Sequence, residues 1–249
     1  MEPNDVTAEQ ATLCSGQQVR HGSGVLANRA FPTKNYSANL DPFVLFERFY
    51  IDPQQGFPMH PHKGFEIVTY MLEGGMDHED TLGVSYTAKA GDAMQITTGR
   101  GIRHSEFAAD GAACNGLQLW VNLPSEQKDA KPDYTSATPG ELPTEEQTGA
   151  TVTTVVGDES PIELYTSMEY LDVQISDTWT WSPPDEWAGF LYAITGAGTV
   201  DGSRFADGDV FLLTAAHDVV LESEESLRVV AVSGLPHHEP IRQRGPFVR

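Results

Sequence analysis

Two short pairs of residues in the first half of the chain have the types and spacing of metal ligands. One proline separates His60 from His62, and one serine separates His104 from Glu106. Residues two apart on a β-strand point to the same face, so each pair could aim both side chains at one ion. If the two strands faced each other, three nitrogens and one oxygen would converge. This set suits Fe(II), Mn, Ni or Cu, and a six-coordinate ion would keep two positions open.

Each histidine also has a plainer interpretation, as a surface or core residue that binds no metal. An isolated His-x-His is more often an accident of a loop or surface, but here glycines flank both pairs and about 40 residues separate them. This narrower pattern predicts a metal site. His78 lies in an acidic run and is expected at the surface as an ion-pair partner. His217 is expected to be structural or exposed, and His237 and His238 are expected to be solvated.

The elements that would carry these pairs are predicted to be β-strands. Apolar stretches are short and rich in Val, Ile, Phe, Tyr and Thr, and Gly, Pro and Asp interrupt them about every ten residues, which is typical of an all-β sandwich or barrel. No long stretch shows a convincing helical period. Examples of these stretches are residues 65–72, 116–123, 189–195 and 227–232.

A repeat divides the chain into two halves. Residues 91–97 resemble residues 208–214, and a Gly-Phe pair begins an apolar strand at Gly64 and again at Gly189. The proline-rich segment 125–150 between them is expected to be a linker. A duplicated β-barrel is the economical interpretation, although Gly-Asp turns are common enough for chance similarity.

The repeat allows the ligands to be transferred to the second half. The positions equivalent to the four candidate ligands form no credible site, so the C-terminal barrel is expected to lack a metal. These positions are Asp185, Trp187, Leu221 and Ser223.

The composition excludes some classes of binding partner. The chain has 36 acidic and 15 basic residues and a formal net charge of −21, a field that repels nucleic acids and anionic membranes. Nothing approaches the roughly 18 consecutive apolar residues of a membrane-spanning helix. The first ten residues, MEPNDVTAEQ, lack the pattern of a secretory signal, so a cytoplasmic protein is expected. Cys14 and Cys114 carry no spacing signal and predict neither a disulfide framework nor a thiolate site.

The acidic residues are dispersed and only 5 of the basic residues are lysines, which suggests a halophilic host. Repulsion among these charges is screened within about 3 Å at 1 M ionic strength. The melting temperature should therefore rise between dilute buffer and molar KCl in a thermal unfolding series. An ordinary acidic protein would show no such gain.

Several longer motifs resemble a known family. The pattern Gly-x3-His-x-His-x3-Glu-x7-Gly followed by Gly-x2-His resembles the two cupin motifs. The wider match is to the pirin family, dense over residues 20–125 and thin afterwards except in the tail. It is carried by Asp41-Pro42-Phe43 and by the blocks GFPMHPHKGFEIVTYMLEGG, GRGIRHSE, GLQLWVNLP and EPIRQRGPFV.

The resemblance implies a bicupin, with two cupin-type β-barrels and one metal in the first. The expected divisions are an N-terminal cupin at 1–124, a linker at 125–150, a C-terminal cupin at 151–235, and a tail at 236–249 that packs back on the first barrel. The implied ligands are His60, His62, His104 and Glu106. In many cupins the carboxylate of the first motif binds the metal, so Glu66 is the rival; otherwise it would orient one of the histidines.

The resemblance also implies an activity. Pirins act as flavonol dioxygenases that open quercetin with dioxygen and release carbon monoxide, here with Fe(II) expected and Mn, Ni, Cu or Zn as alternatives. Glu106 would accept the proton of the flavonol 3-hydroxyl. The alternative is a non-enzymatic, redox-dependent regulator that binds a protein partner, and a monomer is expected. No G-x-S-x-G or phosphate-binding loop is present. The side chains expected to hold a planar substrate, or simply to pack the core, are Phe57, Met59, Met94 and Phe107.

Overall fold

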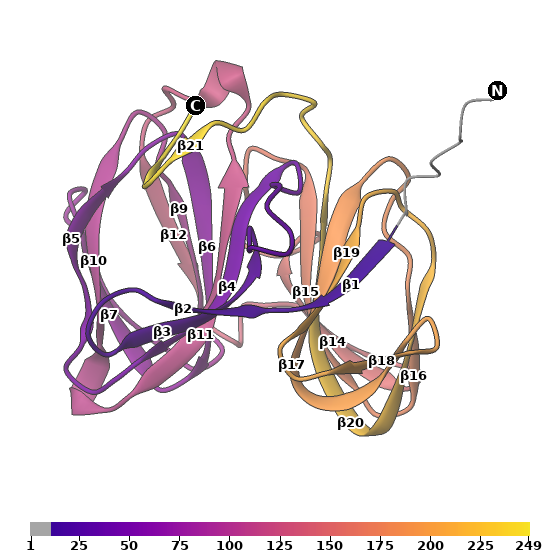
Figure 1. The fold of residues 1–249 in the computed structure, drawn as a ribbon. Helices are drawn as coiled ribbons and strands as arrows, with labels where there is room; N and C mark the ends of the chain where they lie inside the picture. Colours follow the sequence, from indigo (N-terminus) through magenta and orange to yellow (C-terminus); the bar gives the residue numbers. More distant parts are fainter. Residues whose placement is uncertain (1–10) are drawn as a thin grey trace.

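The computed structural model describes residues 11–249, which fold into two β-rich halves (Figure 1). Residues 1–10, which are not expected to form a secretory signal, lie outside the described residues. Within the described range the helical segments are two short 3-10 turns, Ala109–Gly111 and Ser125–Gln127. None of the helices in that range is long and apolar enough to cross a bilayer.

The first half contains two sheets. A seven-stranded sheet has the order β12-β9-β6-β11-β4-β3-β2, and a four-stranded sheet has the order β5-β10-β7-β8. The strands of the larger sheet are β2 (Gln17–Arg20), β3 (Val25–Phe31), β4 (Phe43–Ile51), β6 (Phe65–Glu73), β9 (Ala93–Thr97), β11 (Cys114–Asn122) and β12 (Asp133–Ala137). Those of the smaller are β5 (Gly56–His62), β7 (Gly75–Asp80), β8 (Ser85–Lys89) and β10 (Ile102–Ala108).

The second half is built on one nine-stranded sheet. Its path is β1-β19-β17-β20-β15-β14-β13, with β16 on β20 and β18 on β17. Its strands are β1 (Ala11–Ser15), β13 (Thr144–Gln147), β14 (Ala150–Val156), β15 (Met168–Ile175), β16 (Thr178–Trp181), β17 (Ala188–Val200), β18 (Ser203–Ala206), β19 (Asp209–Leu213) and β20 (Val219–Gly234). A small hairpin, β21 (Gln243–Arg244) and β22 (Phe247–Val248), follows.

The predicted all-β, two-cupin architecture is confirmed, although among residues 11–249 the sheets are not hydrogen-bonded into closed barrels. The repeated Gly-Asp turns are equivalent. Gly91 and Gly208 have φ values of 85° and 81°, a region that glycine adopts without strain. The carboxylates of Asp92 and Asp209 each accept a hydrogen bond from the backbone N–H three residues earlier, at 2.9 and 3.1 Å.

The two halves pack through a shared aromatic core. Strand β6 is buried on both faces: Phe65 and Ile67 face the interior of the first half, whereas Val68 and Tyr70 join a cluster that includes residues of both halves. In that cluster the ring of Phe190 lies 4.7–5.6 Å from three phenylalanine rings of the first half. Edge-to-face contacts of this kind favour one relative orientation of the halves.

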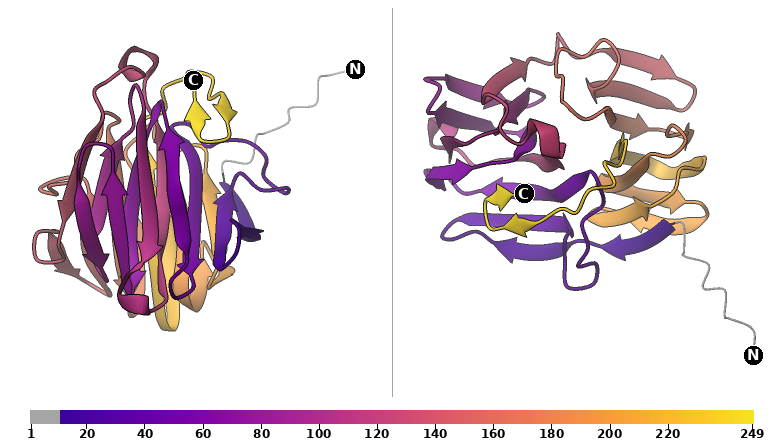
Figure 2. Two further views of the ribbon diagram at one scale, coloured as in Figure 1. Left: turned by 90° about the vertical axis from the view of Figure 1, so that its left-hand side faces the viewer. Right: turned by 90° about the horizontal axis from the view of Figure 1, so that it is seen from above.

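Each end of the chain contacts the other half. Strand β1 pairs with β19, although residues 11–15 fall in the range expected for the first cupin. The tail runs from the second half over the first (Figure 2), where the backbone of Lys63 bonds to that of Val248 at 3.0 Å. A Cβ at Gly64 would lie 2.1 Å from the Val248 carbonyl oxygen, so this approach requires glycine. The segment expected to be a linker contains β12 and β13, which extend different sheets.

Candidate metal centre

The two histidine-bearing strands are neighbours. Strands β5 and β10 pair antiparallel, and His60 lies directly opposite His104. A bulge follows His104, so that Glu106 stands opposite Phe57. Because bulges redirect side chains, this one sets where the carboxylate points. The facing arrangement expected of the two pairs is therefore present.

The three imidazoles converge. Their ring centroids lie 4.5–4.9 Å apart, and one ring nitrogen of each lies within 4.8 Å of the others. The Nε2 atoms of His60 and His104 are 3.1 Å apart. His60 Nδ1 lies 2.8 Å from the carbonyl oxygen of Pro58, which can only accept, so this ring donates from Nδ1 and leaves the Nε2 lone pair for a ligand.

Burial favours the neutral form of His62 and His104. His62 and His104 are 4% and 1% exposed. Burial and the neighbouring histidines His104 and His60 lower the pKa of His62 to about 3. Burial, followed by His60 and His78, holds the pKa of His104 well below its usual value. A neutral imidazole is the form that binds a metal ion.

Glu106 does not join the group formed by His60, His62 and His104; its carboxylate instead groups with His104 and His78. It is 2% exposed, and its Oε1 atom is 4.0 Å from His104 Nδ1. Gln118 Nε2 donates to its Oε2 at 3.4 Å, while Gln118 Oε1 accepts from Trp120 Nε1 at 3.1 Å. The buried His62 Nδ1 has no hydrogen bond, and together with the neutral rings of His62 and His104 it fits a divalent metal ion.

A cavity of about 350 Å³ opens beside the cluster. That volume lies within the range of about 300–1,000 Å³ for small-molecule sites. The ring of Trp120 lies 5.1 Å from that of His62 and stacks on Phe65 at 4.3 Å. The tail contributes Gln243, Gly245 and Pro246 to the wall. The cavity thus combines aromatic surface with the candidate ligands His60, His62 and Glu106.

The aromatic and apolar lining was predicted in part wrongly. Phe57 lines the cavity. Met59 and Phe107 are 41% and 38% exposed, because their strand positions point away from those of the ligands. Met94 is buried in a core cluster against which Phe57 also packs, so the alternative of core packing holds for Met94. Trp120 and Gln118, which the sequence interpretation did not single out, lie on the wall instead.

Glu66 is not part of the cluster. The turn at Gly64 separates β5 from β6 and breaks the strand parity expected from His62. Glu66 instead lies on the same face of β6 as Val68, where it accepts hydrogen bonds from Gln95, Thr97 and the backbone N–H of Tyr165 at 2.9–3.0 Å. It therefore neither joins the histidines nor orients them.

Burial gives Glu66 a pH-dependent effect on stability. Burial raises its pKa from 4.5 to about 7, although its three donors oppose the rise. Because the folded pKa exceeds the unfolded one, its contribution is present below about pH 4.5 and is lost as pH rises through 7. The free energy of unfolding should fall by about 3 kcal/mol from this group alone. Denaturant titrations from pH 5 to 8 measure this decrease in the free energy of unfolding. The decrease should be absent in Glu66→Gln.

The matched control for that titration is the exposed Glu163, which lines the same small cavity as Glu66. Glu163→Gln should keep the pH dependence of the parent protein. Equal pH profiles for the parent and Glu66→Gln would contradict the assignment.

His78 was wrongly placed at the surface. It is 1% exposed, and its ring lies 5.5 Å from that of His104 and stacks on Tyr134 at 5.0 Å. The expected ion-pair partner is present, since His78 Nε2 lies 3.3 Å from Asp80 Oδ2. The signal was available: Met76, His78 and Asp80 alternate along β7 as its buried face. The acidic composition of the run obscured that period.

Two family models match the chain. Residues 24–121 match the model described as Pirin, and residues 170–249 match the model described as the Pirin C-terminal cupin domain. Among curated relatives, Pirin-1 of Arabidopsis thaliana is 38% identical over 92% of this chain and 84% of its own length. Human Pirin is 37% identical over 84% of this chain and 77% of its own.

Solved structures agree on the fold. A quercetin 2,3-dioxygenase from Acinetobacter baumannii superposes with a TM-score of 0.86 at 27% identity, covering 95% of this chain and 90% of that one. A bacterial pirin from Escherichia coli in complex with nickel(II) gives 0.75 at 22% identity, covering 91% and 99%. At that identity the second likeness shows the fold alone.

Proposed function

Because the chain belongs to the pirin family, we propose that it is a metal-dependent flavonol dioxygenase. It would hold one divalent ion, Fe(II) in the first instance, open quercetin-type substrates with dioxygen in a 2,4-cleavage, and release carbon monoxide. The observation that carries this proposal is the convergence of His60, His62 and His104 beside an aromatic-walled cavity. The relative from Acinetobacter baumannii, named for quercetin dioxygenation, supports the choice of substrate class.

The ligands are assigned to His60, His62, His104 and Glu106. The three rings offer nitrogen atoms, with 3.1 Å between the Nε2 atoms of His60 and His104. Glu106 Oε1 lies 4.0 Å from His104 Nδ1. When bound, a divalent ion supplies Lewis-acid polarisation of a substrate oxygen and redox chemistry with dioxygen. Burial of His104 and Glu106 keeps bulk water away from that centre.

The cavity residues bind and orient the substrate. Phe57 and Trp120 present ring surface to a planar molecule, and such contacts hold an aromatic ligand without fixing many rotatable bonds. Glu106 also lines the cavity, so its carboxylate can accept the proton of a hydroxyl placed beside the histidines. Gln118, which donates to Glu106 Oε2, keeps the carboxylate in that position.

The test is turnover by the loaded protein. The full chain, purified at high salt and loaded anaerobically with Fe(II), should consume quercetin in air and release one carbon monoxide per quercetin. Trapping the gas with reduced haemoglobin separates 2,4-cleavage from simple oxidation of quercetin. One bound ion per chain without turnover of any flavonol would overturn the enzymatic proposal.

A further inference from the structure

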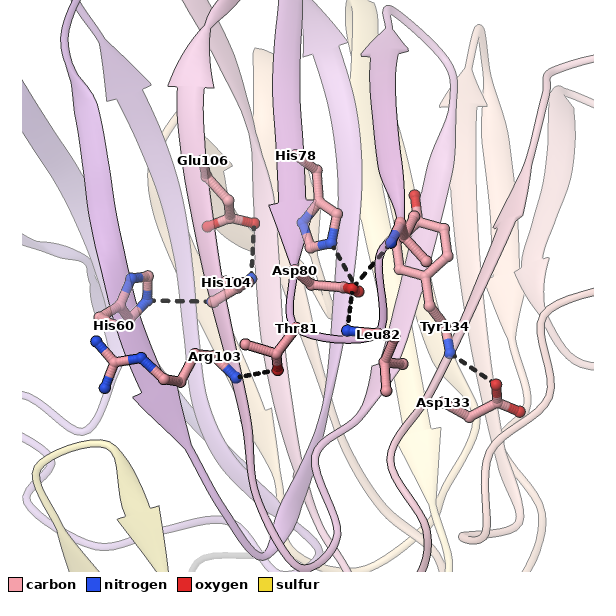
Figure 3. Close-up of polar contacts among 11 residues, drawn as sticks. His60, His78, Asp80, Thr81, Leu82, Arg103, His104, Glu106, Asp133 and Tyr134 are labelled. Atoms are coloured by element: carbon pink, nitrogen blue, oxygen red, sulfur yellow. Dashed lines mark hydrogen bonds and ion pairs between the residues drawn. The ribbon is translucent and has the colours of Figure 1, made fainter.

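The buried side chains of His78, His104 and Glu106 lie together, and each has one polar atom without a hydrogen bond. These atoms are His78 Nδ1, His104 Nδ1 and Glu106 Oε1, and none has a hydrogen-bonding partner among the described protein atoms. All three side chains are at most 2% exposed, and one ligand atom of each lies within 4.8 Å of the others. Figure 3 shows the three side by side on β7 and β10. Buried groups of this kind cost about 1–3 kcal/mol each when left unpaired.

The ring of His78 is held in one orientation. Asp80 Oδ1 accepts from the backbone N–H groups of Leu82 and Val84 at 2.7 and 3.1 Å, which fixes the carboxylate. Asp80 Oδ2 then lies 3.3 Å from His78 Nε2. Because a carboxylate accepts, the His78 ring donates from Nε2, and in the neutral ring Nδ1 keeps its lone pair. Stacking on Tyr134 fixes the plane of the ring.

The other two atoms need complementary partners. His104 turns its Nε2 towards His60, so a metal-binding His104 carries its proton on Nδ1. Glu106 Oε1 is an acceptor, but at 4.0 Å from His104 Nδ1 it is too far for a direct hydrogen bond. Two atoms joined through one water are about 4–5 Å apart, given bonds of about 2.8 Å.

We propose that one buried water bridges His78, His104 and Glu106, and that His78 is a positioning residue for the metal-binding His104. The water accepts from His104 Nδ1 and donates its two protons to His78 Nδ1 and Glu106 Oε1. This satisfies all three atoms, and about three hydrogen bonds is the usual number for a buried water. The chain Asp80–His78–water–His104 then fixes the tautomer and ring orientation of the ligand. The positioning role rests on the proposed metal site, whereas the water bridge does not.

Two matched substitutions separate this role from simple packing. The Oδ1 of asparagine in His78→Asn takes the place of Nδ1 and can still accept from the water. The amide nitrogen of glutamine in His78→Gln reaches the position of Nε2 and keeps the hydrogen bond to Asp80. This variant has no acceptor for the water at the position of Nδ1. Both lose the stack on Tyr134, so they should be similarly destabilised in thermal unfolding. The control is His217→Asn. It removes an imidazole that lies far from the site and whose Nε2 is 3.5 Å from Asp201 Oδ2.

The readouts are Co(II) titrations followed by visible absorption and high-resolution crystal structures without added metal. His78→Gln should bind Co(II) 10–100-fold more weakly and alter its visible bands, whereas His78→Asn and His217→Asn should stay within about threefold of the parent. Density for one water should appear in the parent and His78→Asn. Equal losses of affinity in both His78 variants, or no such density in the parent, would overturn the inference. A parent that binds no Co(II) yet shows the water would overturn the metal site and leave the bridge supported.

Discussion

Replacing His60 with alanine should abolish stoichiometric metal binding and, with it, any flavonol turnover. His60 supplies the Nε2 that faces His104 Nε2 at 3.1 Å, and its own Nδ1 is committed to Pro58. The substitution removes one of three convergent nitrogens, so metal affinity should fall on the order of 10²-fold or more, beyond the 10–100-fold expected for outer groups. Metal analysis after dialysis should give about one ion per parent chain and almost none for the variant.

The fold should survive this change. His60 is half-buried, so truncation leaves little of a cavity and the thermal unfolding temperature without metal should hardly move. His217→Ala serves as the control for the loss of an imidazole. A His60→Ala protein that retains one ion and the parent's turnover would refute the assigned site.

Glu106→Gln should keep the ion and lose turnover. Glutamine preserves the shape of the side chain and an oxygen that can accept from Gln118, and the three histidines remain. The amide cannot accept a proton, so kcat should fall 10²–10⁴-fold, the usual contribution of a general base. Stopped-flow turnover with metal content measured on the same sample tests this. Full metal content with unchanged kcat would exclude Glu106 as the proton acceptor.

Local rules predicted the part of the site that lies within single strands. The period of two placed His60 and His62 on one face, and the repeated Gly-Asp turns indicated the duplication. The same rule failed for Glu66 because Gly64, with φ of 87°, ends one strand and resets the alternation. The alternation of buried residues along β7 would have placed His78 correctly. The acidic composition of its run led instead to the prediction of a surface residue. Glycine at a strand boundary therefore limits how far parity can be extended.

Long-range pairing could not be predicted in this way. Nothing in residues 11–15 specifies β19 as their partner, because strand pairing depends on which edges the rest of the fold leaves open. The bulge between His104 and Glu106 is similar: it sets the direction of the carboxylate, but it depends on the register against β5. The fold class can be predicted from composition and from the Gly, Pro and Asp residues that interrupt the apolar stretches. The residues of the cavity wall are brought together only by tertiary contacts.

The contribution of the tail to the cavity wall bears on the order in which the site is assembled. During synthesis the histidine strands leave the ribosome well over a hundred residues before Gln243, Gly245 and Pro246. Domains begin to fold as they emerge, so the nascent first half presents its imidazoles while that side is still open. An ion bound at the proposed site would enter without passing the tail, and docking of the final strands afterwards would narrow its route of escape. Metal selection would then reflect the ions available at translation, with slow exchange in the finished protein.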